Sequence, residues 1–148
     1  EQLGTGGALW NARDHLEDEF ILLWGDDYHP IQYAPLVNLH REASSKLTMT
    51  VTTDHHEKNL QYADGRLIHY AKDVDVSKEF NGYEAGTSIV RKSLVEASAK
   101  EGKWSWEKTV YPAMSNDIHV HIDNTKFWDM GTPEGLERLE QFFNEPRS

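Results

Sequence analysis

Cysteine is absent from this chain of 148 residues, and so are long apolar runs and any excess of positive charge. Without cysteine the chain can form no disulfide, no thiolate nucleophile and no zinc–thiolate site. No apolar stretch reaches the roughly 18 residues that a membrane-spanning helix needs. Fifteen Lys and Arg against 25 Asp and Glu give a net charge of −10. This balance argues against a general nucleic-acid or anionic-membrane binder, although a local phosphate pocket stays open.

The chain opens with Glu-Gln-Leu-Gly-Thr-Gly-Gly, which has neither the basic nor the apolar segment of a signal peptide. We therefore expect a soluble, cytoplasmic protein. The absence of Met at the start indicates that the natural beginning was processed, trimmed or cut. A length of 148 residues fits one domain, and no linker or repeat interrupts the chain, so we expect a single domain over residues 1–148.

Apolar spacing predicts the helices and strands. Helices are expected over residues 5–16, after Pro30, and over 94–99, 106–114 and 133–143. Strands are expected over 19–24, 46–53, 83–90, 118–122 and 126–128, with a hairpin over 60–71. The apolar run 19–24 is typical of a strand buried on both faces of a parallel sheet, whereas 46–53 alternates and predicts one buried face. The order of elements indicates an α/β fold with a mostly parallel sheet, in which ligands bind beyond the carboxyl ends of strands.

A glycine-rich segment, Leu3-Gly4-Thr5-Gly6-Gly7-Ala8, leads into the first predicted helix. Glycines let backbone approach a ligand closely, and free N–H groups at a helix start attract anions or base edges. A tight turn before a helix, with Thr5 as its cap, explains the same residues equally well.

Two acidic positions follow predicted strands. Gly25-Asp26-Asp27 ends the apolar strand, and Asp129 ends a later one, just before Thr132 and Pro133 open the last helix. Paired carboxylates at strand ends can hold Mg²⁺ together with substrate phosphates. The alternatives are an Asx turn at Asp26 and an ordinary helix cap after Asp129.

Other candidates carry weaker signals. Lys72 could neutralise a phosphate or be simply solvated, and Glu84 could bind ligand hydroxyls or lie at a sheet edge. Neither the His55-His56 pair nor the His119/His121 pair has a third ligand at a metal-site spacing. No Gly-x-Ser-x-Gly elbow supports a serine hydrolase.

The order of these motifs resembles that of the sugar-phosphate nucleotidylyltransferases. The resemblance rests on five segments, namely 1–8 (EQLGTGGA), 22–27 (LLWGDD), 64–72 (DGRLIHYAK), 83–86 (YEAG) and 128–134 (WDMGTPE). It implies a Rossmann-like, mostly parallel sheet of the nucleotide-diphospho-sugar transferase type. It also implies transfer of a nucleoside monophosphate from a nucleoside triphosphate to a sugar 1-phosphate, giving a nucleotide sugar and pyrophosphate.

The resemblance also implies roles for individual residues. Asp26 and Asp129 would hold Mg²⁺, and Lys72 would meet the sugar phosphate. Gly4, Thr5 and Gly6 would contact the nucleobase, and Glu84 with Gly86 would face the sugar. Glu84 stands where many members have Asn, which shifts the expected sugar.

The family's glycine-rich Gly-x-Gly-Thr-Arg loop, which cradles the triphosphate, has no counterpart here. We therefore expect an N-terminally truncated, partial domain that does not turn over by itself. The edge of strand 19–24 would then be open, so the chain would self-associate there or be covered by a missing segment. The alternative function is a non-catalytic module that binds a nucleotide sugar.

Overall fold

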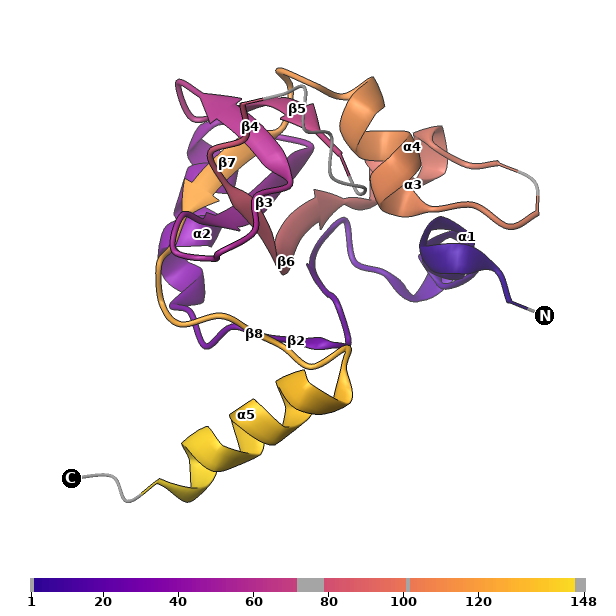
Figure 1. The fold of residues 1–148 in the computed structure, drawn as a ribbon. Helices are drawn as coiled ribbons and strands as arrows, with labels where there is room; N and C mark the ends of the chain where they lie inside the picture. The colour runs from indigo at the N-terminus through magenta and orange to yellow at the C-terminus, as the bar shows by residue number, and fades with distance from the viewer. Residues whose placement is uncertain (1, 72–78, 101, 146–148) are drawn as a thin grey trace.

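A computed structural model describes residues 2–71, 79–100 and 102–145 (Figure 1). Six strands form the main sheet, in the spatial order β1 (Glu19–Leu23), β6 (Tyr83–Arg91), β3 (Leu47–Thr52), β7 (His119–Ile122), β5 (Arg66–Tyr70) and β4 (Leu60–Ala63). Two short strands, β2 (Asp27–Tyr28) and β8 (Trp128–Asp129), form a separate ribbon. The α/β class expected from the sequence is therefore present.

Helices lie on both sides of the main sheet. The described helices are α1 (Gly4–Asn11), α2 (Tyr33–Glu42), α3 (Lys92–Ala97), α4 (Trp106–Ala113) and α5 (Pro133–Asn144), with a 3₁₀ turn at Arg13–His15, and all but α5 pack near the main sheet. Helix α2 packs on one face, whereas α1, α3 and α4 gather on the other side (Figure 1). The larger apolar core lies under α3 and α4, and it includes Trp104, Trp106 and Tyr111.

The sheet is mixed and mostly antiparallel, so the prediction of a mostly parallel sheet is wrong. Among the described strands only β3 and β7 pair in parallel. Helix α2 does connect two strands of the same direction, β1 and β3. Strand β6 runs between them in the opposite direction and pairs with both. The spacing of apolar residues predicts every strand of the main sheet, although not β2, where a turn was expected. It carries no information on the order in which the strands pair.

Strand β1 lies at the edge of the sheet, where β6 is its only neighbour among the described residues. None of its residues is fully buried, and Ile21 and Leu23 are 44% and 54% exposed. The prediction of a strand buried on both faces inside a parallel sheet is therefore wrong. Apolar side chains on an open strand edge are unusual, because such an edge can pair with another chain.

Strand β3 is buried on both faces along its whole length, rather than on one face as its alternating pattern predicts. Two of its threonines hold hydrogen bonds on the polar-looking face. Thr48 Oγ1 lies 2.9 Å from His40 Nδ1, and Thr52 Oγ1 lies 3.3 Å from Asn124 Oδ1. Helix α2 covers β3, so a row of threonines that resembles a solvent face is buried. Thr48 and Thr52 find hydrogen-bond partners there, whereas Thr50 Oγ1 has none among the described residues.

Local signals for turns and caps are largely confirmed. Asp64 and Gly65 link β4 and β5 with φ of 51° and 70°, the left-handed conformation of a tight hairpin turn. Thr132 caps α5, with its side-chain oxygen accepting from the Gly135 N–H. Thr5 does not cap α1 as predicted, because it lies inside the helix and bonds to Glu107 instead.

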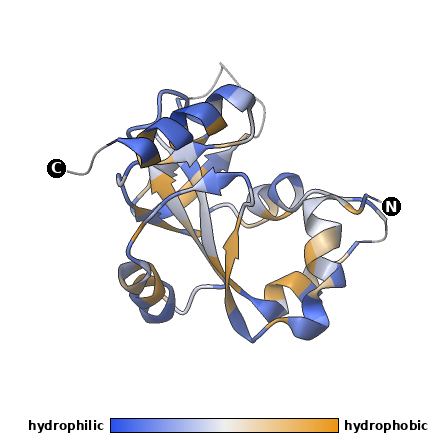
Figure 2. Ribbon diagram, turned by 90° about the horizontal axis from the view of Figure 1, so that it is seen from below, coloured by the Kyte–Doolittle hydropathy of each residue, from blue (hydrophilic) through white to orange (hydrophobic). Residues whose placement is uncertain are grey.

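Helix α5 reaches away from the sheet and packs on the β2–β8 ribbon (Figure 1). Its surface is mostly hydrophilic, with a few apolar residues (Figure 2). Leu139 is buried, and Phe142 stacks beside Trp128 with ring centroids 4.9 Å apart. In the described part of the chain, no helix is long and apolar enough to cross a bilayer.

Candidate functional site

Three aspartates, Asp26, Asp27 and Asp129, meet at the β2–β8 ribbon and form what we call the acid cluster. Asp27 pairs directly with Asp129 in the antiparallel register. Asp26 precedes β2, and its carbonyl oxygen accepts the Met130 N–H at 2.7 Å. Two segments a hundred residues apart are thus fastened together by main-chain hydrogen bonds.

Gly131 shows how closely the carboxylates converge. A Cβ placed on Gly131 would lie 3.0 Å from Asp129 Oδ1 and 3.3 Å from Asp26 Oδ2. Both oxygens therefore face one small space that exists because residue 131 has no side chain. The Gly131 N–H also donates to Asp129 Oδ1 at 2.7 Å and fixes the orientation of that carboxylate. The expected convergence of Asp26 and Asp129 is present.

Asp27 is half-buried and lies against Gly86 of β6. Gly86 has φ of 74°, and a Cβ there would overlap the Asp27 side chain. Burial, and then the neighbouring charges of Asp26 and Asp129, raise the pKa of Asp27 to about 7. Asp27 therefore carries part of a proton near neutral pH, which reduces the repulsion within the acid cluster.

Glu84 lies behind the acid cluster and is buried. The Trp24 indole Nε1–H donates to its two carboxylate oxygens at 3.3 and 3.0 Å, and the Gly86 N–H donates to Oε1 at 3.1 Å. Burial raises the pKa of Glu84 to about 8, against the lowering effect of the Trp24 hydrogen bond. The alternative of a sheet-edge carboxylate is excluded, because β6 is an interior strand.

An aromatic wall stands beside the acid cluster, and the sequence gives little sign of it. The His55 and Tyr83 rings stack with centroids 4.0 Å apart, and Phe127 lies 5.6 Å from His55 and 5.7 Å from Tyr83. Burial, and then the charges of Asp129 and Asp27, raise the pKa of Tyr83 to about 12. A cavity of about 440 Å³ opens next to His55 and Phe127. The available signal was that His55 follows the predicted strand 46–53, Tyr83 begins the strand 83–90, and Phe127 lies in the short strand 126–128.

The space beside the glycine-rich segment is occupied by other residues of the protein. The Gly6 N–H donates to Trp104 O at 3.0 Å, and a Cβ on Gly6 would overlap the Trp104 ring. A Cβ on Gly4, whose φ is 73°, would overlap the Trp104 carbonyl. Thr5 Oγ1 donates to Glu107 Oε2 at 2.5 Å and accepts the Trp106 N–H at 2.9 Å. Packing inside the protein therefore accounts for all three residues. Lys72 lies outside the described residues.

The acid cluster fits a hard cation better than a transition metal. Within the described ranges, no group of three or more His, Cys, Asp or Glu side chains has the arrangement of a metal centre. Two carboxylates that share one space suit Mg²⁺, which takes one or two protein carboxylates and completes its shell with phosphates and water. The residues present therefore fit such an ion.

Two curated relatives are mannose-1-phosphate guanylyltransferases. The one from Schizosaccharomyces pombe is 30% identical over 148 aligned positions, covering 90% of this chain and 39% of the relative. The one from Mycobacterium tuberculosis is 22% identical over 145 positions, covering 92% and 40%. The chain thus spans about two fifths of their length. No protein-family model matches it.

Solved structures share the fold. HddC from Yersinia pseudotuberculosis, in a complex with GMP-PN, superposes with a TM-score of 0.80 at 23% identity, covering 97% of this chain and 64% of HddC. UDP-glucose pyrophosphorylase from Acinetobacter baumanii gives 0.78 at 11% identity, covering 99% and 59%. The resemblance that the motifs predict is therefore confirmed.

Proposed function

Because the chain is related to the sugar-phosphate nucleotidylyltransferases, we propose that its residues form the metal- and sugar-binding part of such an enzyme. The reaction transfers a nucleoside monophosphate from a nucleoside triphosphate to a sugar 1-phosphate. The observation that carries the proposal is the convergence of Asp26 and Asp129 on the space at Gly131. Mannose 1-phosphate and GTP are the first pair to test, since two relatives are named for that reaction.

Asp26 and Asp129 would hold Mg²⁺ in this scheme. When bound, the ion supplies positive charge to phosphate oxygens as charge develops on them. The Gly131 N–H keeps Asp129 aimed at the shared space, and the ribbon keeps Asp26 beside it. These groups therefore do the positioning on which phosphoryl chemistry largely depends.

The sugar would lie between Glu84, Gly86 and the aromatic wall. The absence of a side chain at Gly86 leaves the space in which Asp27 lies, so Gly86 would shape the sugar site by placing that carboxylate. Tyr83 with His55 offers a flat apolar surface for the sugar ring. Lys72 would neutralise the sugar phosphate. A phosphate oxygen of the sugar 1-phosphate attacks the α-phosphorus, forming a new P–O bond, while the bond to the β-phosphate breaks and pyrophosphate leaves.

The loop that cradles the triphosphate is not among these 148 residues, which hold no Gly-x-Gly-Thr-Arg segment. We therefore expect no turnover from residues 1–148 alone. Activity is expected when the chain is produced with whatever residues its coding sequence places before Glu1, provided that they contain such a loop.

The decisive experiment measures Mg²⁺-dependent pyrophosphate release by that longer preparation with GTP and mannose 1-phosphate, then with other pairs. Asp26→Asn and Asp129→Asn should each lower kcat about a thousandfold or more, as the loss of a central electrostatic group does. Asp14→Asn, an exposed carboxylate in the 3₁₀ turn, is the matched control. Full activity of either cluster variant would refute the proposed role.

A non-catalytic nucleotide-sugar-binding module is the second candidate, and residues 1–148, which hold no Gly-x-Gly-Thr-Arg segment, would by themselves suit that role. Calorimetry with GDP-mannose and Mg²⁺ separates the two. Binding by the longer preparation without any turnover would select the module, whereas pyrophosphate release would select the enzyme.

We also propose that residues 1–148 alone self-associate through β1. No strand of the described residues pairs with its outer edge, and Ile21 and Leu23 are exposed on this strand. Light scattering should show a concentration-dependent dimer that Leu23→Lys abolishes, while Leu136→Lys on α5 leaves it unchanged. A clean monomer at high concentration would contradict this.

A further inference from the structure

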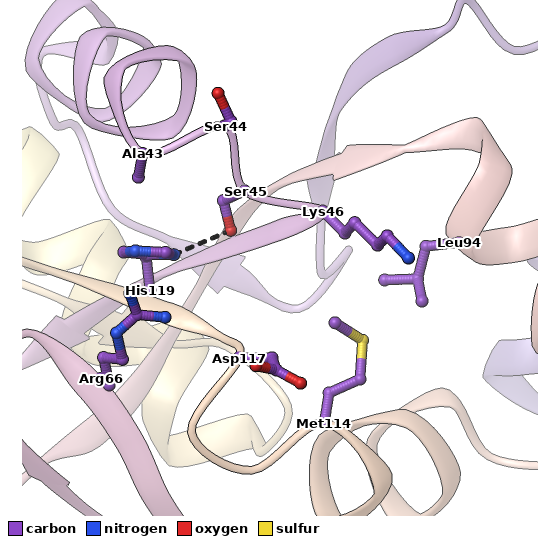
Figure 3. Close-up of a pocket in the computed structure, with 9 residues that line it drawn as sticks. All are labelled: Ala43, Ser44, Ser45, Lys46, Arg66, Leu94, Met114, Asp117 and His119. Carbon is purple, nitrogen blue, oxygen red and sulfur yellow. Dashed lines mark hydrogen bonds between the residues drawn. The ribbon is translucent and has the colours of Figure 1, made fainter.

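A second cavity, of about 480 Å³, lies at the opposite end of the sheet from the acid cluster. Strands β3 and β7 begin beside it, at Leu47 and His119, whereas the acid cluster lies where β1 ends and β6 begins. The C-terminal ends of α2 and α4 border it, together with α3 and the start of β5, and Figure 3 shows the side chains that line it. None of them takes part in the function proposed above.

Two cations face this cavity in a chain whose net charge is −10. Lys46, which directly precedes β3, reaches toward Leu94, and Arg66 of β5 lies beside His119 across the cavity (Figure 3). Asp117 is the single acidic side chain of the lining and lies between them. In the described part of the chain, the Lys46 ammonium group has no hydrogen bond or ion pair. Arg66 uses Nη1 for the Asn116 carbonyl, at 3.1 Å, and its other N–H groups stay available. The lining thus carries a local positive charge that the other described residues do not neutralise by ion pairs.

Ser45 and His119 add polar groups to the wall. Ser45 Oγ donates to Leu47 O at 2.7 Å, so the His119 Nδ1–H donates to Ser45 Oγ at 3.0 Å and Nε2 is left to take up a proton. Burial and the charge of Arg66 lower the pKa of His119. An anion in the cavity would favour the protonated ring, so His119 is a natural reporter of binding.

Leu94 and Met114 give the same cavity an apolar side. A ligand that fits has an anionic head between Lys46 and Arg66 and an apolar body against Leu94 and Met114. Two cations against one carboxylate suit a doubly charged phosphoryl group better than a singly charged carboxylate, and guanidinium with ammonium is a common phosphate-binding pair.

We propose that this cavity is a second ligand site, which binds a small phosphomonoester with an apolar substituent. The site needs no divalent cation and is separate from the acid cluster. It therefore stands whether or not the chain is a nucleotidylyltransferase.

Phenyl phosphate is the probe, titrated into the chain in EDTA and followed by calorimetry and by NMR of the histidine rings. We expect saturable 1:1 binding, tighter than that of inorganic phosphate, and a rise in the pKa of His119. Arg66→Gln and Lys46→Gln should each weaken binding about tenfold or more, as the loss of one charge-assisted hydrogen bond does. Asp117→Asn should strengthen it.

The controls separate a built site from general attraction to cations. Lys103→Gln and Arg138→Gln remove exposed cations elsewhere and should leave the affinity unchanged. Asp26→Asn should also leave it unchanged, which makes the outcome independent of the proposed function. Absence of binding, or equal losses in the Lys103 and Lys46 variants, would overturn the proposal. Circular dichroism tests whether each variant is folded. If Arg66→Gln fails to fold, Lys46→Gln still tests the proposal, because Lys46 is exposed.

Discussion

The glycine segment at residues 4–7 and the glycines at 86 and 131 differ in what fills the space left by the missing side chain. At Gly6 the space is taken by the Trp104 ring, and at Gly4 by the Trp104 carbonyl. At Gly86 it is taken by Asp27, and beside Gly131 lie the carboxylates of Asp129 and Asp26. A glycine in a motif marks a close approach, and only the identity of the approaching group separates core packing from a binding site.

Gly6→Ala should have the largest effect on stability. The added methyl group would overlap the Trp104 ring, which is buried and cannot move aside, so we expect a loss of about 3 kcal/mol in the free energy of unfolding. Urea denaturation followed by tryptophan fluorescence measures it. Gly25→Ala is the matched control, because nothing lies within 4 Å of its added Cβ. Equal stability of both variants would break the comparison.

Glu84→Gln should remove a pH dependence of stability. The pKa of Glu84 is raised to about 8 in the folded protein, from 4.5, so the folded state holds an extra proton between these values. The contribution of Glu84 to stability therefore falls as pH rises from about 4.5 to about 8, by at most about 1.4 kcal/mol per pH unit. Thermal unfolding across this range should show that stability depends less on pH in Glu84→Gln than in the unmodified chain. The dependence of stability on pH should be unchanged in Glu137→Gln. An unchanged profile in Glu84→Gln would contradict the assignment.

Thr5→Val should have a smaller effect, of about 1 kcal/mol, because it removes two hydrogen bonds, to Glu107 and from Trp106, without changing the shape of α1. The same denaturation experiment measures the loss. Nucleotide-sugar binding by Thr5→Val tests the other interpretation. A variant that folds normally but loses binding would support the predicted contact of Thr5 with the nucleobase.

Gly131→Ala should have the smallest effect on stability, below about 0.5 kcal/mol for an exposed site. Its methyl group would enter the space shared by Asp26 and Asp129, so the binding of Mg²⁺ should weaken at least tenfold while the fold persists. Stabilisation of the chain by added Mg²⁺ is the measurement. Unchanged Mg²⁺ stabilisation would show that the ion, if bound, lies elsewhere.

Features decided by short stretches of sequence were predictable. The Asp64-Gly65 turn, the Thr132 cap and the positions of most strands follow from local chemistry. The meeting of Asp26 and Asp129 was predictable too, because both follow strands and belong to motifs in a family order. Their binding of Mg²⁺ stays a prediction.

Features decided by long-range pairing were not predictable. The insertion of β6 between β1 and β3 makes the pairing antiparallel where a parallel sheet was expected. The covering of β3 by α2 turns Thr48 into an interior residue. The stacking of His55 on Tyr83 joins two segments that share no local pattern. In each case the residues allow several partners, and only the assembled chain selects one.

The β2–β8 ribbon has a consequence for the last helix. A Cβ on Gly135, at the start of α5, would overlap the Asp129 carbonyl, so the first turn of α5 lies directly against the strand that carries Asp129. An ion held by both Asp26 and Asp129 would tie that strand to the segment before β2. Binding of the cation would then restrain α5, and the orientation of α5 would report on whether the ion is bound.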